Sequence, residues 1–252
     1  IAPAQGGNGG LRFIADMLEN TSREIYVNKF LHPTEFLVPP FDSIAAQKQS
    51  RYTAAEIVFC NTVFSDKKQQ ISKEKNDAGK FVILSSGGKD SLLTYGIINE
   101  IAEAHPVFIN ESGRHWYTAY NAYQYFKDNE PNTVKPWCNS DRIFTWIAKQ
   151  MPFIRPSFQQ IRSDVYPIRL WTVAVFLFAA LPVARKRNCR NILIGNEYDC
   201  TQKLNFKGIT HYNSLYDQSK YFDNALTRYY HKKQWNMYQF SLLRSLSELL
   251  IL

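Results

Sequence analysis

A short run of hydroxyl, glycine and charged residues is the part of this sequence best suited to chemistry. Residues 85–91, SSGGKDS, stand between an apolar run and a segment with helical periodicity. Glycines let the backbone approach a phosphate closely, and the free N–H groups at the start of a helix attract an anion. Hydroxyl groups can donate to phosphate oxygens, and Lys89 supplies a positive charge. The run therefore predicts a binding site for a phosphorylated ligand.

Asp90 within this run limits what the ligand can be. A carboxylate repels phosphate unless a cation lies between them, so we expect Asp90 to hold a Mg²⁺ ion that bridges phosphates. The spacing differs from a Walker loop, which needs an earlier glycine and a Ser or Thr after the lysine, and from the dinucleotide fingerprint G-x-G-x-x-G. A serine–glycine turn that only caps a helix is the alternative without function.

Alternating strand and helix patterns surround the loop from residue 81 onward. Short apolar runs, typical of buried parallel strands, occupy residues 81–84, 107–110 and 191–195. Helical periodicity covers residues 90–104, 116–126, 141–149, 166–187 and 221–252. This order predicts an α/β fold whose parallel sheet is covered by helices on both faces.

The first third of the chain has a different character. Residues 11–18 have helical spacing, prolines then interrupt the pattern, and a polar, lysine-rich connector spans residues 65–80. We therefore expect an N-terminal subdomain or flap over residues 1–79 and the main domain over residues 80–252. The chain starts without methionine and stops within an apolar helical pattern. This is the pattern of an excerpt whose main domain is truncated at its C-terminus.

Charge, cysteine spacing and apolar runs restrict the class of protein. The formal net charge of +8 favours an anionic ligand, but the positive residues are spread widely, so a nucleic-acid partner is not the first expectation. No two of the four cysteines form a C-x-x-C pair, which argues against a zinc ribbon or a redox motif. No secretory signal opens the chain, and its longest largely apolar stretch, residues 170–184, is shorter than the about 20 residues of a spanning helix. We therefore expect a cytoplasmic protein without a membrane partner.

The loop resembles that of a known family. Residues 86–91 match the S-G-G-x-D-S motif of the N-type PP-loop ATP pyrophosphatases, which include NAD, GMP and asparagine synthetases and several tRNA-modifying enzymes. The resemblance covers residues 81–202. It implies a Rossmann-like sheet of the HUP class, with ATP and Mg²⁺ as cofactors. It also implies that ATP is cleaved between its α and β phosphates and that AMP is transferred to a substrate oxygen.

By the same resemblance, the residues that follow three strands would contact the nucleotide, because ligands of parallel sheets bind beyond the carboxyl ends of the strands. The implied ATP-binding residues are Ser85, Ser86, Gly87, Gly88, Lys89, Asp90, Ser91, Asn110, Glu111, Gly195 and Asn196. Lys89 and Asp90 would also be catalytic. Glu197 and Asp199 join Asp90 as candidate Mg²⁺ ligands, with ordinary loop acids as the alternative interpretation.

The segment between the second and third strands resembles a narrower family. Residues 115–121, 135–142, 152–156 and 162–171 are similar to the bacterial epimerases that act on UDP-N-acetylmuramoyl-L-alanyl-L-glutamate. This resemblance implies an ATP-dependent isomerase of peptidoglycan synthesis and cell wall biogenesis. Such an enzyme inverts the terminal L-glutamate and releases AMP and pyrophosphate.

The same segment contains groups for an anionic substrate and for proton transfer. Arg155, Arg162 and Arg169 are the candidate substrate ligands, because guanidinium groups pair bidentately with carboxylates and phosphates. Adenylation would convert the glutamyl carboxylate to a neutral acyl group, from which a base can remove the α-proton. The candidate acid/base residues are His115, Tyr117, Cys138 and Asp164. Of these, the predicted catalytic residues are Cys138 and Asp164.

Other functions stay open as alternatives. The chain could be another PP-loop adenylating enzyme, either tRNA-modifying or amide-forming. The positive charge suits tRNA, whereas the lack of a C-x-x-C pair argues against thiolation. A nucleotide sensor that binds ATP without cleaving it is the non-catalytic alternative.

Overall fold

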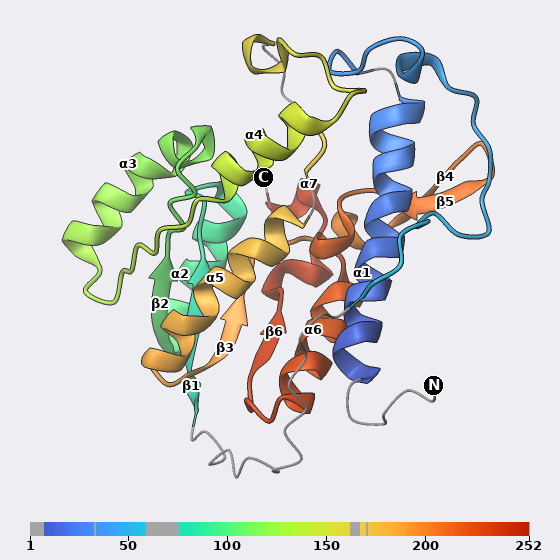
Figure 1. The fold of residues 1–252 in the computed structure, drawn as a ribbon. Coiled ribbons are helices and arrows are strands. Elements are labelled where there is room, and N and C mark those ends of the chain that lie inside the picture. Colours follow the sequence, from blue (N-terminus) through green and yellow to red (C-terminus); the bar gives the residue numbers. More distant parts are fainter. Residues whose placement is uncertain (1–7, 33, 59–75, 162–166, 170, 252) are drawn as a thin grey trace.

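The computed structural model describes residues 8–32, 34–58, 76–161, 167–169 and 171–251 (Figure 1). Within these residues, one parallel sheet has four strands in the order β2-β1-β3-β6. The strands are β1 (Asp77–Leu84), β2 (Glu103–Val107), β3 (Cys189–Leu193) and β6 (Tyr238–Phe240). Because β1 pairs with β2 on one side and β3 on the other, the chain reverses its direction across the sheet at β1. Such a switch point is where open α/β sheets bind ligands.

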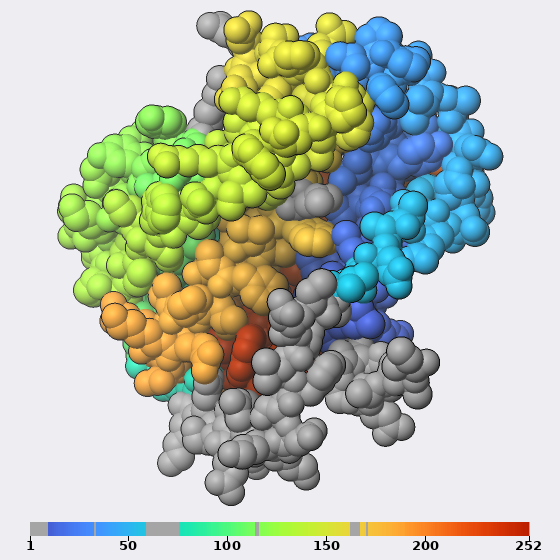
Figure 2. Space-filling view, viewed as in Figure 1, coloured from blue at the N-terminus to red at the C-terminus, as the bar shows by residue number. Residues whose placement is uncertain are grey.

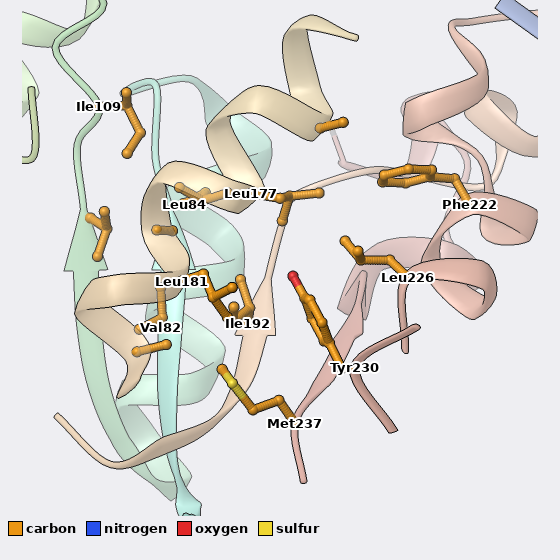
Figure 3. Packing of buried hydrophobic residues seen from close by; sticks show 14 of the residues in the cluster. Val82, Leu84, Ile109, Leu177, Leu181, Ile192, Phe222, Leu226, Tyr230 and Met237 are labelled. Carbon is orange, nitrogen blue, oxygen red and sulfur yellow. The ribbon is translucent and has the colours of Figure 1, made fainter. Parts of the chain in front are cut away.

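Helices cover both faces of this sheet, as the alternating pattern predicted. Helices α2 (Lys89–Ile101) and α3 (Arg114–Asn129) pack on one face through a cluster that includes Ile83 and Leu193. Helices α5 (Thr172–Lys186) and α6 (Lys220–Lys232) pack on the other face, where Leu177 and Tyr230 are fully buried (Figure 3). The alternation of side chains along a strand sends neighbouring strand residues to these two clusters. The parallel α/β fold is thereby confirmed.

The N-terminal segment shares a core with the sheet domain. Helix α1 (Asn8–Ile25) continues into a π-helical turn (Tyr26–Leu31), and its Phe13 and Met17 are buried in the same cluster as α5 and α6. Phe13 stacks on Tyr229 of α6 at a centroid distance of 5.1 Å. The division of the chain at residues 79 and 80 stays a prediction.

A third apolar cluster joins the segment after α1 to the region around α4 (Ser140–Gln150). Phe36 and Leu37 pack there against Ala148 and Ile154. Figure 2 shows the two regions touching, blue against yellow, at the top of the molecule. Short elements complete the described chain: the antiparallel hairpin β4 (Lys203–Phe206) and β5 (Ile209–Tyr212), α7 (Glu248–Ile251), and 3-10 helices at Phe41–Ser43, Phe158–Gln160, Asp199–Thr201, Tyr216–Gln218 and Leu242–Ser245.

The structure corrects the predicted position of the second strand. Residues 103–107, which the periodicity assigned partly to a helix, form β2 beside β1. Of the predicted strand 107–110, Val107 is the last residue of β2, whereas residues 108–110 lie beyond it and bond to a different segment, with Phe108 N donating to Val134 O at 2.9 Å. The apolar run 106–109 is buried along its whole length, so its composition does not distinguish the two pairings.

Two predicted helices also needed correction. The tail 221–252 contains α6, but then strand β6, whose three residues are too few to show a strand period. The predicted helix 166–187 begins instead at Thr172. Trp171 has φ = 55°, a left-handed conformation that prevents the helix from extending to earlier residues. Residues 162–166 and 170 lie outside the described residues. Among the described helices, none is both long and apolar enough to cross a membrane.

Candidate functional site

The loop between β1 and α2 is fixed by bonds among its own residues. The hydroxyl groups of Ser85 and Ser91 lie 3.0 Å apart, and the N–H of Gly87 donates to Ser85 Oγ at 3.1 Å. Ser91 Oγ also donates to the carbonyl oxygen of Gly88 at 2.9 Å. Gly87 has φ = +79°, and a Cβ atom there would lie 2.8 Å from Ala122 Cβ, so this position requires glycine. The loop is therefore fixed by its own bonds at the start of a 13-residue helix, where free N–H groups favour an anion.

The two charged residues of the loop have different surroundings. Lys89 Nζ lies 3.0 Å from Glu248 Oε1, on an exposed face. Asp90 is half-buried, and burial together with the nearby Glu197 carboxylate raises its pKa. A cation beside Asp90 would oppose both effects, because it favours the ionised carboxylate.

The loop after β3 packs directly onto the first loop. A Cβ atom on Gly195 would lie 2.7 Å from Asp90 C and 2.8 Å from Asp90 O, so only glycine permits this approach. The next residue, Asn196, is 3% exposed, and its N–H donates to Ile194 O at 3.0 Å. Two loops that are far apart in sequence thus meet at the carboxyl end of neighbouring strands.

A cavity of about 440 Å³ opens where these loops meet. Both loops contribute to its wall, together with the end of β1, the loop after β2 and the first residues of α5. Its polar lining residues are Ser85, Ser86, Asp90, Ser91, Glu111, Arg169, Thr172, Asn196 and Gln218. Leu84, Ile109, Val173 and Phe176 are among its apolar lining residues. A wall that combines polar and apolar side chains suits a ligand with both a charged part and a less polar part.

Two buried polar atoms at this cavity have no partner within the described chain. They are Asp90 Oδ1 and Asn196 Nδ2. A buried polar atom without a partner is costly, so such atoms mark places where a ligand or ion completes the bonding. The residues present therefore fit Mg²⁺ beside Asp90 and a polar ligand atom beside Asn196.

The predicted metal ligands are not equivalent in the structure. Asp199 accepts bonds on both oxygens, from Gln202 Nε2 at 3.2 Å and from the N–H of Glu248 at 2.8 Å. Glu197 Oε1 accepts from the thiol of Cys200 at 3.1 Å. In the part of the chain that the structure describes, no three His, Cys, Asp or Glu side chains are grouped closely enough to hold a metal ion. Among the three predicted ligands, Asp90 is the one that lines the cavity.

The residues after β2 divide between the cavity and the protein scaffold. Glu111 is 2% exposed and lines the cavity, while its Oε1 accepts the N–H of Trp116 at 2.8 Å at the start of α3. Asn110 is not in the cavity wall, and its Oδ1 accepts the N–H of Ser112 at 3.0 Å. Ser112 has φ = 65°, so Asn110 stabilises a left-handed turn.

The three predicted substrate arginines are in three different situations. Arg169 lines the cavity and pairs with Asp141, with Nη2 2.5 Å from Oδ1. Arg155 is outside the cavity wall, and its Nε donates to the carbonyl oxygen of Leu37 at 2.9 Å, which fixes the N-terminal segment. Arg162 lies outside the described residues.

The candidate acid/base residues are not gathered at the cavity by the described chain. Cys138 is half-buried, absent from the cavity wall, and its sulfur lies 3.3 Å from Ser140 Oγ. Tyr117 is 78% exposed. Asp164 and the side chain of His115 lie outside the described residues. Of the two candidates that the structure describes, neither lines the cavity, and the roles of Asp164 and His115 stay predictions.

Sequence reasoning missed the wall opposite the phosphate loop. Thr172, Val173 and Phe176 come from α5, and Leu215 and Gln218 come from the segment before α6. The buried Asp217 holds these two parts together, because its Oδ2 accepts the N–H groups of Val173 at 2.9 Å and Ala174 at 3.0 Å. The sequence signal was a single aspartate after a hairpin, which is too common to single out.

Buried carboxyl groups also lie behind this wall. Burial raises the pKa of Asp217 to about 6, despite its backbone hydrogen bonds. Burial also raises the pKa of Glu24 to about 8, and the charge of Asp217 adds to that shift. Glu24 is 2% exposed, and its Oε1 has no hydrogen-bond partner in the described chain. This side of the cavity is therefore sensitive to protonation.

Comparison with known proteins gives little beyond the fold. No protein-family model matches the chain, and no curated protein matches it in sequence. Among solved structures, it is similar to the U34-tRNA thiolase NcsA from Methanococcus maripaludis, determined with its 4Fe–4S cluster, at a TM-score of 0.37 and 13% identity. The match covers 71% of this chain and 55% of the thiolase, so the chain spans about half the length of that protein. A likeness this low carries no argument about activity.

Proposed function

We propose that this chain is an adenylating enzyme of the PP-loop type. In this proposal it binds ATP at the cavity between the loops after β1 and β3 and cleaves the bond between the α and β phosphates. The AMP group passes to a substrate carboxylate oxygen, and pyrophosphate is released. The supporting observation is the cavity itself: an internally bonded SSGGKDS loop, Gly195 packed on it, and the unpartnered atoms Asp90 Oδ1 and Asn196 Nδ2.

Each part of the loop has a role in this reaction. The N–H groups at the start of α2 and the hydroxyl groups of Ser86 and Ser91 would bind the departing pyrophosphate. Asp90 would hold Mg²⁺, which would neutralise phosphate charge when bound. Lys89 would turn from Glu248 to the phosphates, since the two groups compete for the same ammonium. Apolar residues of the cavity wall, such as Val173 and Phe176, would contact the adenine ring.

For the acceptor we propose the terminal glutamate of UDP-N-acetylmuramoyl-L-alanyl-L-glutamate, which the enzyme would epimerise. The support is the resemblance of residues 115–171 to that epimerase family and the guanidinium of Arg169 in the cavity wall. Arg169 already pairs with Asp141, so a substrate carboxylate would share it or displace Asp141. In this proposal a base removes the α-proton of the adenylated glutamate, an acid returns a proton to the opposite face, and water then releases AMP.

A tRNA acceptor is the second candidate. The formal net charge of +8 favours it, because phosphate contacts dominate the affinity of proteins for nucleic acids. The two candidates predict different triggers of AMP release, so one assay separates them.

The test is to incubate the protein with ATP and Mg²⁺ alone, with the UDP-linked dipeptide, or with tRNA, and to separate the nucleotide products. AMP and pyrophosphate formed only with the dipeptide, together with D-glutamate and solvent deuterium at its α-carbon, would support the epimerase. AMP formed only with tRNA would support the second candidate. ADP as the product would show that the loop is not a pyrophosphatase loop.

The Asp90→Asn variant provides the matched test of the site. We expect its AMP release to fall below about one hundredth of the wild-type rate, because the metal-binding carboxylate is lost from a preorganised electrostatic site. Asp128→Asn is the control, because this substitution removes the same charge from an exposed position on α3. Equal rates for both variants would contradict the role of Asp90.

A further inference from the structure

Arg244 links the C-terminal segment to the cavity through an unusual number of contacts. It lies in the 3-10 helix Leu242–Ser245 that follows β6, and its side chain is 13% exposed. Its Nη1 donates to the carbonyl oxygen of Glu197 at 3.2 Å and to Thr201 Oγ1 at 3.3 Å. Its Nη2 donates to the carbonyl oxygen of Gln218 at 2.6 Å.

A buried carboxylate fixes the guanidinium in this position. Asp223 of α6 is 4% exposed at its side chain, and its Oδ2 accepts from Arg244 Nη2 at 2.8 Å and from Nε at 3.1 Å. Gln239 Nε2 donates to the other oxygen, Oδ1, at 2.9 Å, and Ser241 Oγ lies 3.2 Å from Oδ2. Arg244 is therefore held from behind, and the atoms that it presents to the carbonyl groups have a defined direction.

Two of the carbonyl groups that Arg244 binds belong to a residue of the cavity wall or to its immediate neighbour. The carbonyl of Glu197 immediately follows Asn196, whose Nδ2 is buried without a partner. Gln218 lines the cavity on the opposite side. We infer that Arg244 is a positioning residue that sets Asn196 and Gln218 at the distance the nucleotide requires. This inference rests on the proposed function, because it deepens the account of the same site.

The geometry separates this role from that of an ordinary buried ion pair. A lysine at position 244 could still neutralise Asp223, but one ammonium group cannot occupy both ends of a planar guanidinium fork. A lysine at position 244 can therefore keep the attraction to Asp223 while it loses bonds to Glu197 or Gln218. If Arg244 only neutralised Asp223, the Arg244→Lys variant would bind the nucleotide with unchanged affinity.

The test uses Arg244→Lys in the full chain and measures the equilibrium binding of ATP with Mg²⁺ and the KM for ATP. We expect ATP to bind at least about tenfold more weakly, with KM rising far more than kcat falls, because directed hydrogen bonds to the carbonyl groups of Glu197 and Gln218 are lost. Hydrogen exchange at residues 195–198 should become faster. Met237→Ala is the matched control: it removes a fully buried side chain from the core, away from the cavity wall, and should lower stability without changing ATP affinity.

A second variant keeps the inference testable if Arg244→Lys does not fold. The pair Arg244→Met with Asp223→Leu replaces both charges by apolar groups, which buried ion pairs often tolerate. It should show the same loss of ATP affinity. Wild-type affinity in either folded variant overturns the inference while leaving the proposed function intact. A wild-type protein that neither binds ATP nor forms AMP overturns the proposed function first.

Discussion

Two loops meet at the cavity, and they are held in place by opposite means. The loop after β1 is bonded within itself, with Ser85 and Ser91 only six positions apart. The loop after β3 is held from outside: Arg244 binds the carbonyl of Glu197 from 47 positions away, and the N–H of Tyr198 donates to Leu246 O at 2.8 Å. One half of the site is therefore determined locally, and the other half depends on the packing of the C-terminal segment.

The largest expected effect comes from breaking the contact between the two loops. In Gly195→Ala, the new methyl group would clash with the backbone of Asp90, so the loops must separate. We expect ATP affinity to fall roughly 100-fold, equivalent to about 2.7 kcal/mol. Isothermal titration with ATP and Mg²⁺ measures this change.

The control for this variant is Gly96→Ala in helix α2, the helix whose first turn Gly195 contacts. A Cβ atom at Gly96 would meet nothing within 4 Å, so the substitution should stabilise the helix by up to about 1 kcal/mol and leave ATP binding unchanged. If Gly195→Ala bound ATP as tightly as Gly96→Ala, the loops would not act as one site.

The next effect is a pH dependence of stability that arises from buried carboxyl groups near the cavity. The pKa of Glu24 is raised to about 8 in the folded chain, so between its ordinary value of 4.5 and about 8 the folded state binds a proton that the unfolded state has released. Stability should therefore fall as the pH rises through this window, by at most about 1.4 kcal/mol per pH unit from this group. Asp217 adds the same sign of change between its ordinary value of 3.8 and about 6. The wall that Asp217 holds, at the start of α5, should loosen first.

Urea unfolding at pH 5.5 and pH 8.5 measures this dependence. Glu24→Gln should remove much of the difference between the two pH values, because the amide does not titrate. The control is Glu35→Gln, an exposed glutamate in the same N-terminal segment. A wild-type protein that gains stability at high pH would contradict the assignment to Glu24.

The smallest effect concerns the contact between the two halves at the surface. Glu248→Gln breaks an ion pair with Lys89 whose side chains are 39% and 64% exposed, so the change in stability should stay within about 1 kcal/mol. ATP should bind a few-fold more tightly, because Lys89 no longer has to break its ion pair with Glu248 before it contacts the phosphates. Weaker ATP binding in this variant would show that Glu248 supports the site rather than competing with it.

The same contrast explains what could be predicted from the sequence. The SSGGKDS loop was visible because its contacts fall within six residues, and the parallel sheet followed from apolar runs that alternate with helices. Arg244 and Gln218 gave no signal, because their partners are tens of positions away. The start of α5 was missed for the same reason: Asp217, which caps it, is 43 positions from Ala174. The proposed roles of Cys138 and Arg155 depended on side-chain direction, which a linear pattern does not contain.

The ion pair between Lys89 and Glu248 has a consequence for folding during synthesis on the ribosome. The two residues are 159 positions apart in the chain. At roughly 5–20 residues per second, the ribosome makes the loop after β1 about ten to thirty seconds before the C-terminal residues that hold the loop after β3. The half that needs no distant partner can fold early, whereas the cavity closes only after the last strand has docked. A nascent chain therefore carries the loop after β1 well before the C-terminal segment can complete the cavity.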